Sequence, residues 1–110
     1  FTVLKWHSTK YGKGFIMHPL HNPSMDRLFE TICALKDKEE CYHFFEDLCT
    51  IKEMQDMAQR FDTAILLDEG KSYQKIAEEV GVSTATISRV NRCLLYGTGG
   101  YRKAIDQIKK

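Results

Sequence analysis

The amino-acid sequence predicts an all-α fold that contains a helix-turn-helix. Apolar residues recur at helical spacing over most of the chain from Ser24 onward. Over residues 72–95 the helical stripe is interrupted once, by a glycine and a serine, which is typical of two short helices joined by a tight turn. A chain of 110 residues with 43% hydrophobic content is the size of one packed domain. We therefore expect a single helical domain.

Residues 1–23 differ in composition from the rest of the chain. They hold two glycines, two prolines and three lysines, with little helical periodicity. We expect irregular structure there, with short strands at residues 2–6 and 15–17. This stretch is treated as an N-terminal extension whose origin the sequence does not indicate, and the helical domain is assigned to residues 24–110.

Two helices are predicted between residues 24 and 48. Ser24 is placed to cap the first, and the charged run 36–40 ends it. Its apolar stripe consists of Leu28, Ile32 and Leu35. The second helix has a broad apolar face made of Cys41, Phe44, Phe45 and Leu48.

A third, long helix is predicted to begin after Thr50. Glu53 follows three residues later, as a capping box requires, and Gly70 ends the helix. Its apolar residues, spaced by three and four, are Ile51, Met54, Ala58, Phe61 and Ile65. Such a seam packs either within one chain or against a second copy. A small helical chain with so many large apolar residues favours the second copy.

The helix-turn-helix is predicted over residues 72–95. Gly81 stands where the chain must turn, because glycine tolerates a positive φ, and Ser83 is placed to cap the second helix. The apolar stripe of the two helices consists of Ile76, Ala77, Val80, Ile87, Val90 and Leu94. Beyond the glycines at 97, 99 and 100, a last amphipathic helix is predicted from Tyr101, Ala104, Ile105 and Ile108.

The outward face of the second motif helix carries small, hydrogen-bonding or cationic side chains. Such side chains fit the major groove of double-stranded DNA. The residues predicted to contact DNA are Ser83, Thr84, Ala85, Thr86, Ser88, Arg89 and Arg92, together with Gln74 and Lys75 of the first motif helix. The alternative is a plain helical hairpin within an all-α core.

Charge is sorted along the chain. The formal net charge is +1, but residues 71–110 carry +5, residues 20–69 carry −7 and residues 1–19 carry +3. The basic part coincides with the motif, as expected of a surface that meets phosphates. The alternative is that the charges only solvate helix faces.

Several classes of site and function are disfavoured by the sequence. Its four cysteines form no C-x-x-C pair, so we expect reduced thiols in a cytoplasmic protein with no metal and no cofactor. We find no apolar stretch long enough to span a membrane. A phosphate-binding loop and a nucleophile elbow are also missing from the sequence, so we do not expect an enzyme.

The chain resembles the Trp repressor family, most closely its YerC/YecD-type branch. The resemblance extends over residues 24–110 and is carried by residues 49–60, 68–70 and 81–89. It implies a six-helix, intertwined homodimer in which each subunit presents one helix-turn-helix. Such a two-fold dimer predicts a palindromic operator with half-sites about one helical turn (~34 Å) apart.

The resemblance also implies an effector pocket. By position its residues are Thr50, Arg60, Thr86, Arg89, Val90 and Cys93. Val90 stands where tryptophan-responsive members have a glycine, and Cys93 where they have a serine. A valine side chain would fill the cleft and cysteine is a poor hydrogen-bond partner, so L-tryptophan is disfavoured as effector. The alternative for Arg60 is an ion pair with a carboxylate.

The sequence thus predicts a dimeric, sequence-specific DNA-binding transcriptional regulator. Two alternatives stay open. One is a ligand-gated repressor that responds to another small metabolite. The other is a protein-interaction module whose helix-turn-helix does not function in DNA binding.

Overall fold

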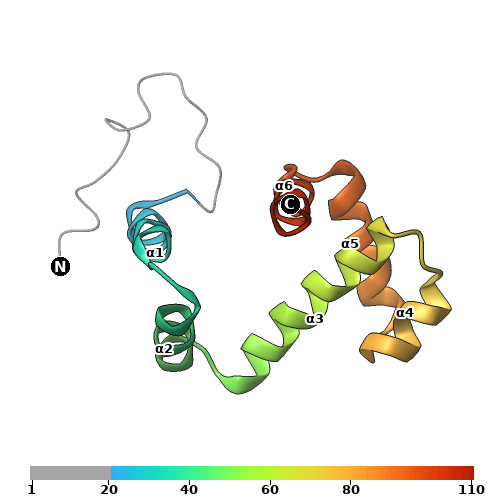
Figure 1. Cartoon of the computed structure of the whole chain (residues 1–110), viewed down its shortest axis with the longest axis horizontal. Coiled ribbons are helices and arrows are strands. Elements are labelled where there is room, and N and C mark those ends of the chain that lie inside the picture. The colour runs from blue at the N-terminus through green and yellow to red at the C-terminus, as the bar shows by residue number, and fades with distance from the viewer. Residues whose placement is uncertain (1–20) are drawn as a thin grey trace. The chain divides into compact units, whose positions relative to one another are not determined.

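The computed structural model describes residues 21–110, so the strands predicted at residues 2–6 and 15–17 lie outside the described part. The described residues form six helices and no strand, which confirms the all-α prediction for them (Figure 1). The helices are α1 (Pro23–Ala34), α2 (Lys38–Leu48), α3 (Ile51–Asp68), α4 (Tyr73–Val80), α5 (Thr84–Tyr96) and α6 (Gly100–Ile108). The chain divides between Leu48 and Cys49 into two units.

The start of α1 differs from the prediction by two residues. Asn22, and not Ser24, caps the helix, since its Oδ1 accepts the N–H of Met25 at 2.9 Å. Pro23 is the first helical residue, where its fixed φ suits the helix and its missing N–H costs no hydrogen bond. The proline therefore decides between two residues that are both able to cap.

The charged run 36–40 separates α1 from α2 as expected, but α2 already begins within it. Asp37 Oδ1 accepts the N–H of Glu40 at 2.9 Å, so the aspartate satisfies a free amide of the first turn. Glu39 and Glu40 lie in that first turn, where negative charge is favourable to the helix dipole.

Neither α1 nor α2 buries a residue. Large apolar side chains on them remain exposed, among them Phe29 and Tyr42 with 53% and 51% of their surface accessible. Phe44 and Phe45 form an edge-to-face pair with ring centroids 5.7 Å apart. These two helices have apolar surface that the rest of residues 21–110 does not cover.

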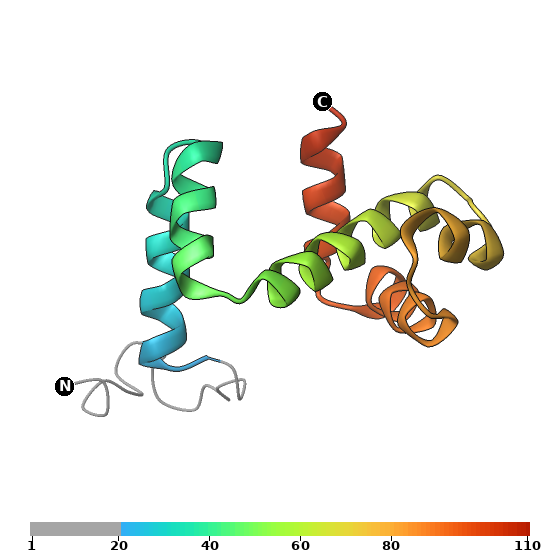
Figure 2. The same ribbon diagram turned by 90° about the horizontal axis from the view of Figure 1, so that it is seen from below.

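The unit Cys49–Lys110 is built on α3. Helices α4 and α5 pack against α3, and α6 contacts both α3 and α5 (Figures 1 and 2). Its central cluster consists of Ala64, Val90 and Ile105, which are almost completely buried. Phe61 and Tyr101 close this cluster with stacked rings, their centroids 6.5 Å apart.

The long apolar seam of α3 is covered only in part. Its C-terminal half packs on the core through Phe61 and Ile65. At the other end Ile51 has 76% of its surface accessible, Ala58 is also exposed, and Met54 is half-buried. Among residues 21–110, Phe61 and Ile65 of the predicted seam pack on the core, and Ile51 and Ala58 stay exposed.

Helix α6 is fastened to the end of α3 by one carboxylate. Asp68 accepts hydrogen bonds from Arg102 and from Lys109, the latter at 2.8 Å. These hydrogen bonds, with Lys109 first and Arg102 second, lower the pKa of Asp68 below its ordinary value of 3.8. The same contact raises the pKa of Lys109 above 10.5. Sequence reasoning missed this cluster.

Asp68→Asn is expected to lower the melting temperature, because the substitution removes the charge shared by both cations. A carboxyl whose pKa is lower in the folded state stabilises the fold above its unfolded pKa, and this stabilisation is lost as pH falls through the folded value. The difference in melting temperature between wild type and variant should therefore be steady from about pH 5 to 8 and shrink below about pH 4.

The matched control is Asp62→Asn on the same helix, whose carboxylate is exposed and forms no ion pair within residues 21–110. It should leave the melting temperature unchanged. Equal effects of the two variants would contradict a specific role for Asp68.

Candidate nucleic-acid interface

The turn between α4 and α5 has the geometry expected of a helix-turn-helix. Gly81 lies in the left-handed region with φ 83° and ψ 25°, and its N–H donates to the carbonyl of Ala77 at 3.0 Å. A Cβ at this position would meet nothing within 4 Å. Glycine is therefore favoured by the backbone conformation and not by lack of space, which confirms the predicted turn.

Ser83 caps α5 as predicted. Its Oγ accepts the N–H of Thr86 at 3.1 Å and donates to Thr86 Oγ1, also at 3.1 Å. A serine hydroxyl has a single hydrogen. The cap uses a lone pair of the Ser83 oxygen, and the contact with Thr86 Oγ1 uses its hydrogen.

Buried side chains fix the rotation of α5. Ile87 is fully buried and Val90 has only 2% of its surface accessible, so the side of α5 that carries them faces the protein. The other side presents five of the residues predicted to contact DNA, all of them exposed: Thr84, Ala85, Ser88, Arg89 and Arg92. Thr86 differs, since it is half-buried beside the turn. The structure thus places five predicted contacts together on one helix face.

Gln74 and Lys75 lie exposed in the first turn of α4. The backbone N–H of Lys75 is bound by the capping hydroxyl of Ser72 at 3.1 Å. Its ammonium group lies 3.6 Å from Glu79, and both side chains are largely exposed. Exposed pairs of this kind contribute little, so the lysine remains available to a phosphate.

The cations of residues 71–110 differ in whether they form ion pairs. Arg89 and Arg92 form no ion pair within residues 21–110, whereas Arg102 and Lys109 are bound to Asp68. Arg102 on α6 and Lys109 directly after it thus join the end of the chain to α3. Both arginines of α5 therefore remain without an ion-pair partner among residues 21–110.

A cavity of about 290 Å³ separates the N-terminal half of α3 from the turn and α5. It is lined by Lys52, Asp56, Gln59, Arg60, Gly81, Val82 and Thr86. Two residues of the predicted effector pocket, Arg60 and Thr86, lie here. The ion pair of Arg60 with a carboxylate, our alternative expectation, is not found among residues 21–110.

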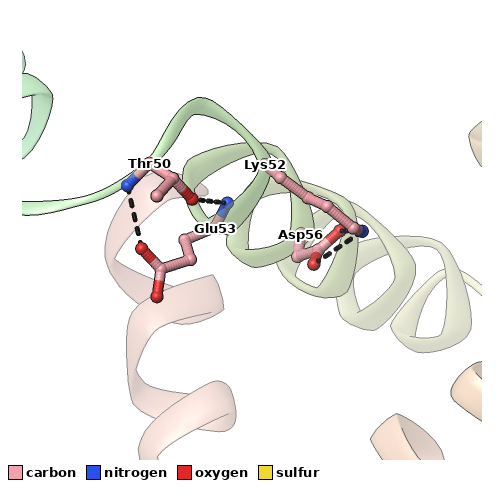
Figure 3. Close-up of polar contacts among 4 residues, drawn as sticks. All are labelled: Thr50, Lys52, Glu53 and Asp56. Carbon is pink, nitrogen blue, oxygen red and sulfur yellow. Dashed lines mark hydrogen bonds and ion pairs between the residues drawn. The ribbon is translucent and has the colours of Figure 1, made fainter.

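The other four predicted pocket residues do not line this cavity. Val90 is buried in the core cluster, and Arg89 and Cys93 are exposed on α5. Thr50 lies at the head of α3 and is engaged in the predicted capping box (Figure 3). Its Oγ1 accepts the N–H of Glu53 at 3.1 Å, and Glu53 Oε1 accepts the N–H of Thr50 at 2.8 Å. Within one chain, the six residues are not brought together.

Sequence reasoning missed most of the cavity lining. Lys52, Asp56 and Gln59 share one face of α3 with Arg60, a polar stripe that the sequence displays. The Lys52 ammonium and the Asp56 carboxylate on this stripe are 3.2 Å apart (Figure 3). Helical spacing identifies such a stripe, but it does not indicate that the turn at Gly81 and Val82 lies opposite. That placement follows from the packing of α5 on α3.

No group of three or more potential metal ligands occurs within residues 21–110. In the same part of the chain, no helix combines the length and hydropathy needed to cross a membrane. The exposed side chains of α5 are thus the described feature that points most directly to a macromolecular partner.

Comparison with known proteins agrees with this architecture. The family model described as Trp repressor protein matches residues 23–109. The uncharacterized protein YerC of Bacillus subtilis (strain 168) is 55% identical over 91 residues, which are 83% of this chain and 88% of YerC. A solved TrpR-like protein from Eubacterium eligens ATCC 27750 is 48% identical with a TM-score of 0.79, covering 82% of this chain and 93% of that one. A solved chain from Staphylococcus aureus is 43% identical, with the same TM-score and coverages of 82% and 90%. The chain therefore belongs to the Trp repressor protein family, a family of DNA-binding regulators and not of enzymes.

Proposed function

We propose that this protein is a sequence-specific transcriptional regulator that acts in the cytoplasm as a homodimer and binds a palindromic operator. The observation that carries the proposal is the outward face of α5. Small, hydroxyl-bearing and cationic side chains are exposed there, while Ile87 and Val90 on the opposite face are buried in the protein. A rigid helix with such a face fits the major groove, where hydroxyls and arginine read base edges and phosphates.

The proposed contacts are those named from the sequence, except that Ser83 and Thr86 act by holding the start of α5. Arg89 and Arg92 are placed to bind guanine or phosphate, and Thr84, Ala85 and Ser88 to meet base edges. Gln74 and Lys75 are placed to bind the backbone from the start of α4. Thr86 and Ser83 support the helix through their shared hydrogen bond.

Homodimer formation is supported by apolar surface that residues 21–110 of one chain leave uncovered. Two thirds or more of the surface of Ile51 and Tyr96 is accessible, as is about half that of Phe29 and Tyr42. A monomeric protein rarely leaves so many large apolar side chains in water, because burial of apolar surface stabilises. A second copy covers such surface symmetrically, and it would supply a second helix-turn-helix.

Ile51→Glu is expected to weaken self-association, since a carboxylate would have to be buried where the seam of α3 meets its partner. Sedimentation equilibrium at micromolar concentration should show a dimer for wild type and a shift toward monomer for the variant. The control is Gln59→Glu, which adds the same charge to a different face of α3. A monomeric wild type, or an equal shift in both variants, would contradict the proposed role of the seam.

The DNA-binding proposal is tested by selection from random duplex DNA at two salt concentrations, with and without L-tryptophan. We expect enrichment of a palindromic sequence whose affinity falls steeply with salt, because bound cations displace counterions from the phosphates. We expect no effect of L-tryptophan, since Val90 occupies the core beside Ala64 and Ile105. Failure to enrich any sequence would favour the alternative of a protein-interaction module, whose apolar contacts depend little on salt.

A ligand-gated regulator is the second candidate function. It is favoured by one observation, the cavity between α3 and the turn. A molecule bound there would contact the scaffold helix and the DNA-binding helix together.

A further inference from the structure

We propose that the first turn of α5 reads the C5-methyl group of a pyrimidine through the methyl groups of Ala85 and Thr84. In unmodified DNA that pyrimidine is thymine, and 5-methylcytosine carries the same group at the same position. This role of α5 deepens the proposed function and depends on it, since it requires the DNA binding proposed above. It names the base feature that the helix recognises.

Ala85 lies at the centre of the outward face of α5. A helix turns by about 100° per residue, so Ala85 lies nearly opposite the midline between the buried side chains of Ile87 and Val90. The Ala85 side chain is exposed. Arg92, seven residues later, is also exposed and points in almost the same direction. The helix thus presents its smallest exposed side chain at the middle of the face, in its first turn.

The side chains on this face become longer along the helix. Ala85 belongs to the first turn, and Arg92 lies about 10 Å further along the helix axis. A recognition helix contacts base edges with its N-terminal residues, so its first turn comes closest to the bases. A methyl group suits that close approach, and an arginine can span the greater distance from a later turn. The shape of the face therefore indicates that Ala85 approaches a base edge most closely.

The first turn of α5 is held in one conformation. Ser83 Oγ accepts the N–H of Thr86 and donates to Thr86 Oγ1, both at 3.1 Å, and Ile87 is fully buried one residue further on. The backbone of Thr84 and Ala85 is thus fixed from both sides. A contact between methyl groups is weak, so it gains from residues that need no ordering on binding. The first turn also contains no acidic residue that would repel phosphates.

The exposed side chains of α5 exclude several other kinds of base reading. Carboxamides read adenine and carboxylates accept from cytosine, but no exposed residue of α5 has either group, and Asn91 is half-buried. Hydroxyls pair with donors and acceptors alike, so they discriminate little. Arginine reads guanine, whereas alanine and the threonine methyl group contact the thymine methyl group. The methyl group is therefore the base feature that suits the first turn.

The test replaces single thymines of the selected operator by deoxyuridine, which lacks only the C5-methyl group. Fluorescence anisotropy measures the affinity of each duplex. We expect one thymine in each half-site to be sensitive, with a loss of about fourfold, the factor that corresponds to burial of one methyl-sized group. At that position, a pair of 5-methylcytosine with guanine should bind more tightly than the unmethylated pair by a similar factor.

Ala85→Gly should lower the ratio of affinities for the thymine and deoxyuridine duplexes from about four towards one, because the protein methyl group is lost. Thr84→Ser removes the other methyl group without the backbone freedom of glycine, and should lower the ratio in part. The control is Ala34→Gly, the same change at an exposed position of α1, which should leave the ratio unchanged. A less stable helix would weaken both duplexes equally, so the ratio reports the methyl contact.

Three outcomes would overturn this role of α5 while leaving the DNA-binding proposal intact. One is a selected operator that tolerates deoxyuridine at every thymine. Another is a ratio that stays the same in both Ala85→Gly and Thr84→Ser. The third is equal affinity for methylated and unmethylated cytosine, which would assign the deoxyuridine effect to deformability of the duplex. Failure to enrich any operator would overturn both proposals together, so the two kinds of failure are distinguishable.

Discussion

Ile87→Ala is expected to destabilise the protein by about 2–5 kcal/mol, the range for removing a large aliphatic side chain from a packed site. Ile87 is fully buried on α5, the helix that packs against both α3 and α4. The loss would be a large part of the stability of a small domain, typically about 5–15 kcal/mol. Urea denaturation at fixed protein concentration measures it, since self-association would make the midpoint depend on concentration.

Ile87→Val is the matched control. It removes one methyl group from the same site and should cost about 0.5–1.5 kcal/mol. An ordered series of wild type, valine and alanine variants would establish close packing around Ile87. A loss of less than about 0.5 kcal/mol in the free energy of unfolding of Ile87→Ala would indicate a loosely packed site. Burial of Ile87 would then not explain the rotation of α5.

Arg89→Ala is expected to weaken binding to a selected operator by about 1–3 kcal/mol if the arginine reads a base, as we propose. Arg89 is exposed and forms no ion pair within residues 21–110, so its removal should not unfold the protein. The melting temperature of the Arg89→Ala variant should stay close to that of wild type. Fluorescence anisotropy with the operator and with a scrambled duplex measures affinity and specificity together.

Arg89→Lys separates base reading from phosphate binding. Lysine keeps the charge but loses the two-pronged geometry of the guanidinium, so a base-reading Arg89 should not be rescued by it. A phosphate-binding Arg89 should be rescued in large part, and its removal should lower the slope of log affinity against log salt by about 1. Unchanged affinity in both variants would contradict any contact of Arg89 with DNA.

The helix-turn-helix shows how far local pattern determines structure. Gly81 and Ser83 were predicted to form the turn and the cap, and the structure confirms both. Each acts over three or four residues, through a backbone conformation or a single hydrogen bond, so the information is contained in the local sequence. The capping box of Thr50 and Glu53 was predictable for the same reason.

The predictions were less accurate where several residues can fill one local role. Asn22 caps α1 in place of the expected Ser24, since Pro23 suits the first helical position. Asp37 accepts the N–H of Glu40, so α2 begins at Lys38, inside a run that was expected to separate two helices. In both places the sequence has more than one residue at which the helix could begin, and local backbone preferences decide which one is used.

The sequence by itself determined the helical class, the caps of α3 and α5, the turn and the face of α5 that is exposed, because each depends on neighbours within a few residues. Only the tertiary structure decided that Asp68 binds Arg102 and Lys109, which are 34 and 41 residues away. Only the tertiary structure placed Arg60 and Thr86 in one cavity while burying Val90 in the core. Such contacts depend on how α5 and α6 pack on α3, and helical periodicity gives the faces of helices but not the partners they meet.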